Sequence, residues 1–293
     1  MARERYRFNT PAGRVFDVVN VVFLTALGIV ALIPFVYVIA GSFATESELT
    51  TRSFFLWPET FSLKAYESIL TSPAFLRAII TTVLVTAVGT AIQLLLTAAM
   101  AYPLSKGNLP GGRVIMGLVV VTLVFSGGMI PTFLVVKDLG LLNTYWALIL
   151  PAAINPFSLI IIKNFFQQLP AELEESAKID GANEVQTLWR IILPLSTPVL
   201  ATFALFYAVG IWNDFMSPLL YLNDSSMWTL QMFLRQVTVA TDLSMVQGDM
   251  TELPPAQGIK FAVIVVATLP ILIFYPFLQK HFAKGMLIGG VKG

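Results

Sequence analysis

Six long apolar segments alternate with polar stretches along the chain. A bilayer core about 30 Å thick takes roughly 20 apolar residues in helical form, because lipid offers no partners to backbone N–H and C=O groups. The pattern therefore predicts an all-α fold, a polytopic membrane helical bundle with about six transmembrane helices. The segments cover residues 17–43, 76–102, 112–136, 145–168, 196–222 and 259–282.

Five of the six apolar segments contain proline, which removes a backbone donor and kinks a helix. Such kinks are tolerated in a membrane where neighbouring helices or water take up the freed carbonyl groups. This distribution indicates a packed bundle rather than a set of separate anchors. These prolines include Pro34, Pro131, Pro151, Pro156, Pro218, Pro270 and Pro276.

Lysine and arginine are unevenly distributed between the two sides of these segments. Twelve of the 18 lie in the two tails and in the loops at 103–113 and 163–195, and six lie in the other loops. Since cytoplasmic segments carry an excess of these residues, both termini are expected in the cytoplasm. The first segment is longer than the apolar region of a signal peptide, so no cleavage is expected. Three parts result: a cytoplasmic tail at 1–16, a six-span domain at 17–282 and a cytoplasmic tail at 283–293.

Composition agrees with a membrane protein and excludes several kinds of site. Of 293 residues, 56% are hydrophobic and 12% are charged, against roughly 25% charged in soluble domains. Cysteine is absent and there is one histidine, so neither a thiolate nucleophile nor a Cys or His metal cluster is available. No metal site and no catalytic residue is predicted. The net charge of +1 gives no long-range attraction to nucleic acid.

One polar stretch, LPAELEESAKIDGANEVQTLWRIILP, interrupts the apolar sequence at 169–194. Pro170 suits the first position of a helix, and the acidic residues that follow complement the positive end of its dipole. Gly181 can take the left-handed conformation that ends a helix. Asn183 is suited to cap a second helix, with Gln186 as its reciprocal partner. This predicts a helical hairpin at 169–195, whereas a merely solvated loop would explain the charges but not the caps.

The hairpin carries a recognisable motif. Glu175-Ser176-Ala177, three residues, Gly181, nine residues and then Ile191-Ile192-Leu193-Pro194 resembles the EAA loop of ABC-importer permease subunits, with Ser176 in place of the middle alanine. The segments WNDFMSPLLYL and GMLIGGVKG are similar to the maltose-type carbohydrate family of these permeases. The segment FSGGMIPTFLVVKDLGLLNTYWALILP resembles its branch for large oligosaccharides, which includes importers of acidic polysaccharides such as alginate.

The resemblance implies a multi-pass permease of the bacterial inner membrane, which forms half of the pathway for an oligosaccharide. The implied partners are a second homologous permease, two copies of a cytoplasmic ABC ATPase, an extracytoplasmic sugar-binding protein and membrane lipid. The chain has no GxxxxGK[ST] motif, so ATP and Mg would be bound by the partner ATPase and the chain itself would hold no cofactor. The resemblance implies ATPase coupling by Glu174, Glu175, Ser176, Ala177, Asp180, Gly181 and Ala182.

A few polar residues lie inside the apolar segments. Because a buried charge is expensive in lipid, Asp214 should face protein or water. Together with Asn155, Trp212 and Asn213, it is a candidate for the substrate pathway, since aromatic rings and amide or carboxylate acceptors suit a hydroxyl-rich ligand. The alternative is a structural role for Asp214 at a helix break before Pro218. Gln93 is expected to form a hydrogen bond between helices.

Two other functions remain possible at this stage. In a stand-alone secondary transporter, Asp214 would be a proton or cation site, although no inverted repeat is visible. An intramembrane enzyme would need a Ser/His or Asp/Asp pair inside the membrane, and the sequence offers none. A non-enzymatic transport subunit therefore fits the residues best.

Overall fold

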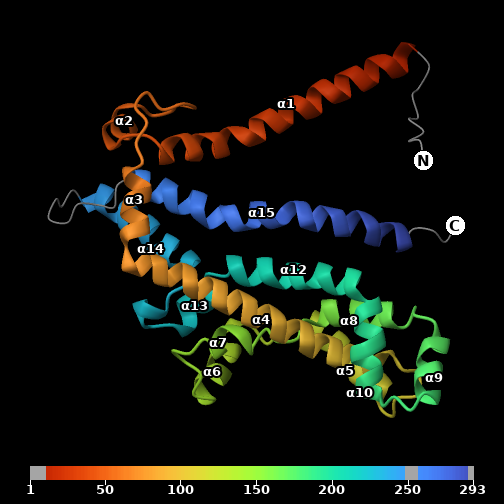
Figure 1. Ribbon diagram of the computed structural model, residues 1–293. Helices are drawn as coiled ribbons and strands as arrows, with labels where there is room; N and C mark the ends of the chain where they lie inside the picture. The colour runs from red at the N-terminus through yellow and green to blue at the C-terminus, as the bar shows by residue number, and fades with distance from the viewer. Residues whose placement is uncertain (1–10, 248–256, 290–293) are drawn as a thin grey trace. The chain divides into compact units, whose positions relative to one another are not determined.

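The computed structural model describes residues 11–247 and 257–289, and every regular element among them is helical (Figure 1). The predicted tails at 1–16 and 283–293 therefore lie partly outside the described residues. The first helices are α1 (Pro11–Ser42), α2 (Glu46–Thr51), α3 (Lys64–Thr71), α4 (Pro73–Ser105), α5 (Gly112–Val124), α6 (Met129–Asp138), α7 (Trp146–Ile149) and α8 (Pro156–Phe166). The others are α9 (Ala171–Ile179), α10 (Glu184–Thr187), α11 (Leu193–Leu195), α12 (Thr197–Asn213), α13 (Met216–Tyr221), α14 (Leu230–Gln247) and α15 (Gln257–Gly289).

The helices pack into two units. The first comprises the described part of residues 1–71 together with 237–266, and the second comprises 72–236 with the described part of 267–293. In the first unit, side chains from α1, α2 and the start of α15 form a small core around Leu49, Phe55 and Phe261. Gly41 faces the Phe261 ring, where a Cβ atom would lie 2.5 Å from a ring carbon, so only glycine allows this approach.

A buried carboxylate organises the loop of the first unit. Glu48 is 6% exposed and accepts hydrogen bonds from the backbone N–H groups of Glu59, at 3.0 Å, and Thr60. Arg52 donates to the same carboxylate at 2.7 Å. These donors lower the pKa of Glu48, the Glu59 N–H most of all. The segment between α2 and α3 is thus fixed although it has no regular secondary structure.

The second unit is built around α4. This helix packs along α12 and α8 (Figure 1), and Gly89 lets Ile211 of α12 approach it closely. Thr97 and Tyr207 join the two helices through a buried hydrogen bond of 3.1 Å. The hydroxyl of Thr82 also accepts a buried hydrogen bond, at 2.7 Å, from the N–H of Leu230 at the start of α14.

Two helices in the described part of the chain are each long and apolar enough to cross a bilayer: α1, over Gly13–Ser42, and the whole of α4. The number rises to four among the described residues if each of two bent helix pairs counts as one span. From residue 18 to residue 32 every residue of α1 is exposed within this chain, so lipid or another protein must cover this apolar surface.

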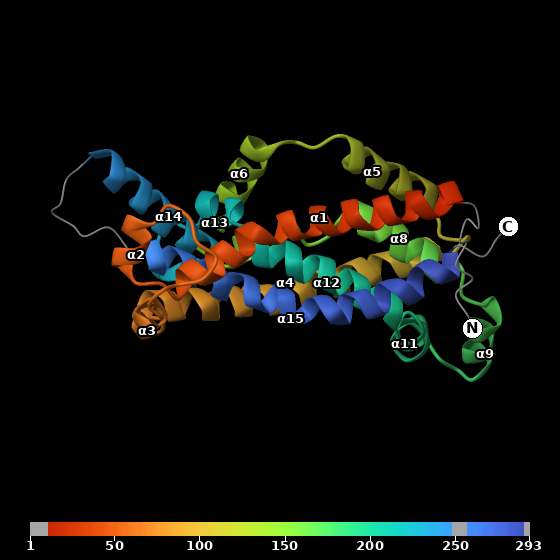
Figure 2. The ribbon, with the colours of Figure 1, turned by 90° about the horizontal axis from the view of Figure 1, so that it is seen from above.

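Three of the six predicted apolar segments are not continuous helices. The segment at 112–136 breaks between α5 and α6, which lie at 118° to each other; Figure 2 shows them joined by an extended stretch. Gly128 lies within this break and has φ +87°, a backbone conformation that interrupts a helix. The segment at 145–168 is irregular between α7 and α8, and the segment at 196–222 breaks at Asp214 and Phe215. Pro151, Asn155 and Pro156 stand at the first of these breaks, where proline interrupts the helix ladder. Asp214 stands at the second.

Candidate functional site

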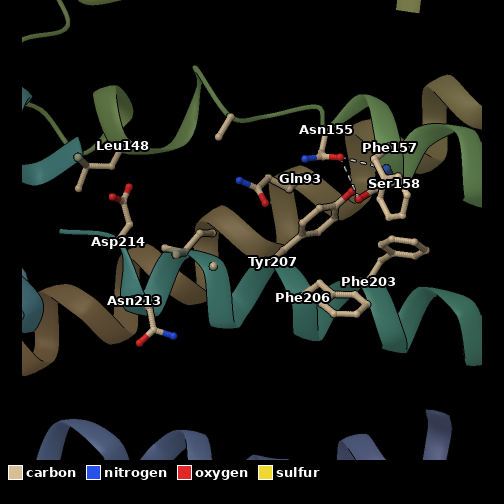
Figure 3. Close-up of a pocket in the computed structure, with 13 residues that line it drawn as sticks. Gln93, Leu148, Asn155, Phe157, Ser158, Phe203, Phe206, Tyr207, Asn213 and Asp214 are labelled. Carbon is tan, nitrogen blue, oxygen red and sulfur yellow. Dashed lines mark hydrogen bonds between the residues drawn. The ribbon is translucent and has the colours of Figure 1, made fainter. Parts of the chain in front are cut away.

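A cavity of about 560 Å³ lies among α4, α8 and α12 (Figure 3). Its polar lining residues are Gln93, Asn155, Ser158, Tyr207, Asn213 and Asp214, and three phenylalanines, Phe157, Phe203 and Phe206, complete the aromatic part. Amide and hydroxyl groups beside aromatic rings suit a hydroxyl-rich ligand. Asp214 is the one charged residue among the described side chains that line the cavity.

Asn155 begins α8 from the irregular segment before it. Its Oδ1 accepts a hydrogen bond of 3.0 Å from the N–H of Ser158 and so caps the helix. The rest of the amide faces the cavity in Figure 3. Asn155 thus has a structural role and is also available to a ligand.

Asp214 directly follows the last residue of α12 and lies two residues before the start of α13. Its Oδ1 accepts hydrogen bonds from the N–H groups of Met216, at 3.0 Å, and Ser217, at 3.1 Å. These bonds stabilise the helix break before Pro218, while the carboxylate still lines the cavity. The carboxylate therefore has the structural role that the sequence suggested, and its place in the cavity lining leaves it a candidate for the substrate pathway.

The neighbours of Asp214 differ from it in placement. Trp212 is buried, and its ring N–H donates to the carbonyl of Ala267 at 3.0 Å, so this candidate packs α12 against α15 and does not line the cavity. Asn213 donates to the carbonyl of Val209 and points away from Asp214 in Figure 3.

Sequence reasoning missed most of the cavity. The side chain of Gln93 was expected to bond a neighbouring helix, but it forms no hydrogen bond with the described residues and lines the cavity instead. Phe203, Phe206, Tyr207 and Gly210 were not singled out. Their spacing of three, four and seven residues places them on one face of α12, and that periodicity was the signal that could have found them.

The hairpin at 169–195 lies at the other end of α4. Its first helix, α9, begins after Pro170 rather than at it. Gly181 has φ +82°, the left-handed conformation that the sequence predicted. Around it, the N–H of Ala182 bonds the carbonyl of Ala177 at 2.9 Å and the N–H of Gly181 bonds that of Lys178 at 3.1 Å. This pair of bonds is a Schellman motif, so the turn depends on a residue that tolerates positive φ.

The second half of the hairpin begins with the predicted helix cap but does not continue as a regular α-helix. Asn183 and Gln186 form the predicted capping box. The helix then widens into a π-helical stretch at Leu188–Ile192, where the N–H of Leu193 bonds the carbonyl of Leu188. Pro194 has no N–H to offer the carbonyl four residues before it, which explains why a regular α-helix does not continue here. The chain turns by 84° at Ser196 into α12.

A polar cluster anchors the hairpin to α4. Lys106, just past the end of α4, pairs with Glu174 of α9 and lies 3.7 Å from Glu184 of α10. The hydroxyl of Tyr102 donates to Glu184 at 2.8 Å, and Lys178 pairs with the same carboxylate at 2.9 Å. The hydrogen bond from Lys178, the largest cause, and that from Tyr102 lower the pKa of Glu184, which keeps it ionised at neutral pH.

The candidate coupling residues are not equally accessible. Glu175, Ser176, Asp180 and Gly181 are exposed. Ala177 is 6% exposed, and Glu174 is turned inward to Lys106. Apolar side chains that no other part of the described chain covers lie beside the exposed group, with Ile179 86% exposed and Trp189 55% exposed. An apolar surface of this kind indicates a protein contact.

Comparison with known proteins agrees with this arrangement. Residues 1–288 match the family described as "Binding-protein-dependent transport system inner membrane component". Protein LplC of Bacillus subtilis is 64% identical over 295 residues and is covered completely, as is this chain. The polygalacturonan/rhamnogalacturonan transport system permease protein YtcP of Bacillus subtilis is 54% identical over 285 residues, with 96% of this chain and 99% of that protein covered.

A solved structure resembles the fold described above. It is a bacterial ABC transporter involved in the import of the acidic polysaccharide alginate, and the matched chain has a TM-score of 0.86 with 32% sequence identity. The match covers 94% of this chain and 99% of that chain. A stand-alone secondary transporter and an intramembrane enzyme are both overturned by these matches. The chain belongs to the family of binding-protein-dependent transport system inner membrane components.

Proposed function

We propose that this chain is one of two permease subunits of an ATP-driven importer for oligosaccharides derived from an acidic polysaccharide. The observation that carries the proposal is the polar and aromatic cavity in a chain 54% identical to a permease named for polygalacturonan and rhamnogalacturonan. Alginate, named for the structure at 32% identity, is also a polyuronate. The higher identity favours pectic fragments over alginate fragments as the cargo.

Energy would enter through the hairpin at 169–195. The chain has no phosphate-binding GxxxxGK[ST] motif, so ATP and Mg would be bound by two copies of a partner ATPase on the cytoplasmic side. The exposed residues Glu175, Ser176, Asp180 and Gly181 offer that partner a surface, together with the uncovered side chains of Ile179 and Trp189. Both termini would then also be cytoplasmic.

The charge of the residues that line the cavity indicates which contacts to the cargo this subunit can make and which its partner must make. Among the described residues, no lysine or arginine lines the cavity, and Asp214 is its one acidic side chain. A uronate would be repelled by this carboxylate, since like charges in a site of low dielectric disfavour each other. We therefore expect the second permease to supply the cations, while this chain contacts hydroxyl groups and ring faces.

The proposal is tested by purifying the tagged chain in mild detergent. We expect an ABC ATPase and a different permease of similar size to copurify. In proteoliposomes, a binding protein loaded with galacturonate oligosaccharides should stimulate ATP hydrolysis severalfold, alginate oligosaccharides less, and maltodextrins not at all. Stimulation by amino acids or metal ions, with every oligosaccharide inactive, would contradict the substrate class.

Two variants separate the structural role of Asp214 from its charge. Asp214→Asn keeps an Oδ1 acceptor for the N–H groups of Met216 and Ser217 but removes the charge. We expect normal amounts of folded protein and galacturonate uptake that is unchanged or higher. Asp214→Ala removes the acceptor, which costs about 1 kcal/mol for comparable caps, so its thermal unfolding temperature should fall. Loss of uptake in folded Asp214→Asn would instead show that the carboxylate contacts the cargo.

A further inference from the structure

A second pocket, of about 490 Å³, lies where α4 ends, α5 begins and α8 ends. Three cationic side chains line it: Lys106, Arg113 and Lys163. The side chains of Asn108 and Gln167 add amide groups, and none of the described residues that line the pocket is acidic. We refer to it as the basic pocket. Neither the cavity described above nor the exposed face of the hairpin includes Arg113 or Lys163.

Two of the three cations are not neutralised within the described chain. Lys106 is paired with Glu174. Lys163 bonds only amide oxygens, that of Gln167 at 2.8 Å and that of Asn164 at 3.4 Å. Arg113 is exposed and forms no ion pair or hydrogen bond with the residues that the structure describes. The basic pocket is therefore left with a positive charge that an anion would balance.

The geometry of the basic pocket suits a phosphate group. A guanidinium offers two parallel N–H donors to phosphate oxygens, and an ammonium adds a point charge. Gly111, with φ +74°, begins the turn into α5, and a Cβ there would meet no other atom within 4 Å. The backbone at this point is thus open to a ligand, beside the positive end of the α5 dipole.

The position of the basic pocket along the helices indicates the source of the phosphate. It lies at the ends of three apolar helices, α4, α5 and α8, where sequence turns polar and a bilayer surface is expected. Basic pockets between helices at this height bind lipid head groups. We propose that the basic pocket binds a phosphate group, supplied by the head group of an anionic phospholipid. This inference does not rest on the nature of the cargo.

The test uses the complete complex purified in mild detergent. Phosphatidylglycerol and phosphatidylcholine are added in turn, with or without excess inorganic phosphate, and bound lipid is measured by native mass spectrometry. The unmodified complex should retain phosphatidylglycerol in preference to phosphatidylcholine. In Arg113→Gln/Lys163→Gln this preference should fall about thirtyfold, at about 1 kcal/mol for each basic residue near the surface.

The matched control removes the same kinds of charge elsewhere. Arg77→Gln/Lys137→Gln should keep the preference; Arg77 lies in the first turns of α4, about 44 Å of helix away from Lys106. Arg113→Lys/Lys163→Arg should keep it as well. If the double glutamine variant does not fold, each single variant should lose about fivefold.

The remaining outcomes show whether the phosphate group comes from lipid or from solution, and which results would overturn the proposal. Displacement of phosphatidylglycerol by inorganic phosphate would support the phosphate site and show that soluble phosphate also reaches it. Insensitivity to inorganic phosphate would support the lipid head group alone. An equal loss in the control variant, or no preference in the unmodified complex, would overturn the proposal.

Discussion

Replacing Gly181 with valine is expected to abolish most transport while the protein remains in the membrane. Residue 181 holds φ +82° in a turn closed by two backbone hydrogen bonds. A residue with a Cβ costs about 1–2 kcal/mol in this conformation, and a β-branched side chain costs more. If the ATPase binds only the native turn, that strain lowers the fraction of permease molecules able to bind the ATPase roughly tenfold or more. Transport and substrate-stimulated ATP hydrolysis in proteoliposomes measure the effect.

An asparagine at the same position separates two causes. Asparagine tolerates the left-handed conformation, and a Cβ at Gly181 would meet no atom of this chain within 4 Å. Gly181→Asn should therefore keep the turn. Normal transport by Gly181→Asn together with failure of Gly181→Val would assign the effect to backbone conformation. Failure of both with an intact hairpin would point to a steric limit set by the partner. Unchanged transport and ATPase retention in both variants would refute the coupling role of the hairpin.

The parts of the hairpin that could be predicted from sequence are those whose causes are local. The positive φ of Gly181 and the capping box of Asn183 and Gln186 depend on residues within four positions of each other. The partner of Glu174 is different, because Lys106 is 68 residues away. No spacing rule relates these two positions. The resemblance implied an ATPase-coupling role for Glu174 but gave no sign of its pairing with Lys106.

The apolar segments were predicted with less accuracy. Hydropathy detects a stretch that is long enough to cross a bilayer, but not whether its backbone is helical throughout. Gly128 and Pro156 were visible in the sequence, yet whether such residues kink or end a helix depends on the groups that satisfy the freed backbone. At α8 that group is the side chain of Asn155. The cavity lies at two of these breaks. Because the breaks were not predicted, most of the residues that line the cavity were not predicted either.

Reversing the charge of Lys106 is expected to have the second large effect. In Lys106→Glu, three carboxylates would meet at the end of α4, because Glu174 and Glu184 already lie there. The side chains of Lys106 and Glu174 are 20% and 22% exposed, and a hydrogen bond to a charged partner at such a site contributes about 1.5–3 kcal/mol. Glu184 is more exposed and adds less. The hairpin should lose its anchor, and transport should fall roughly tenfold or more.

The charge swap Lys106→Glu/Glu174→Lys restores the lost pair and provides the decisive comparison. Its transport should recover most of the loss if the pair positions the hairpin, whereas Lys137→Glu, an exposed cation at the end of α6, should change little. The swap still leaves a carboxylate at position 106 in the basic pocket. Retention of phosphatidylglycerol should therefore stay low while transport returns. Loss of transport in the swap, with normal folding, would mean that Lys106 acts through something other than its pairing with Glu174.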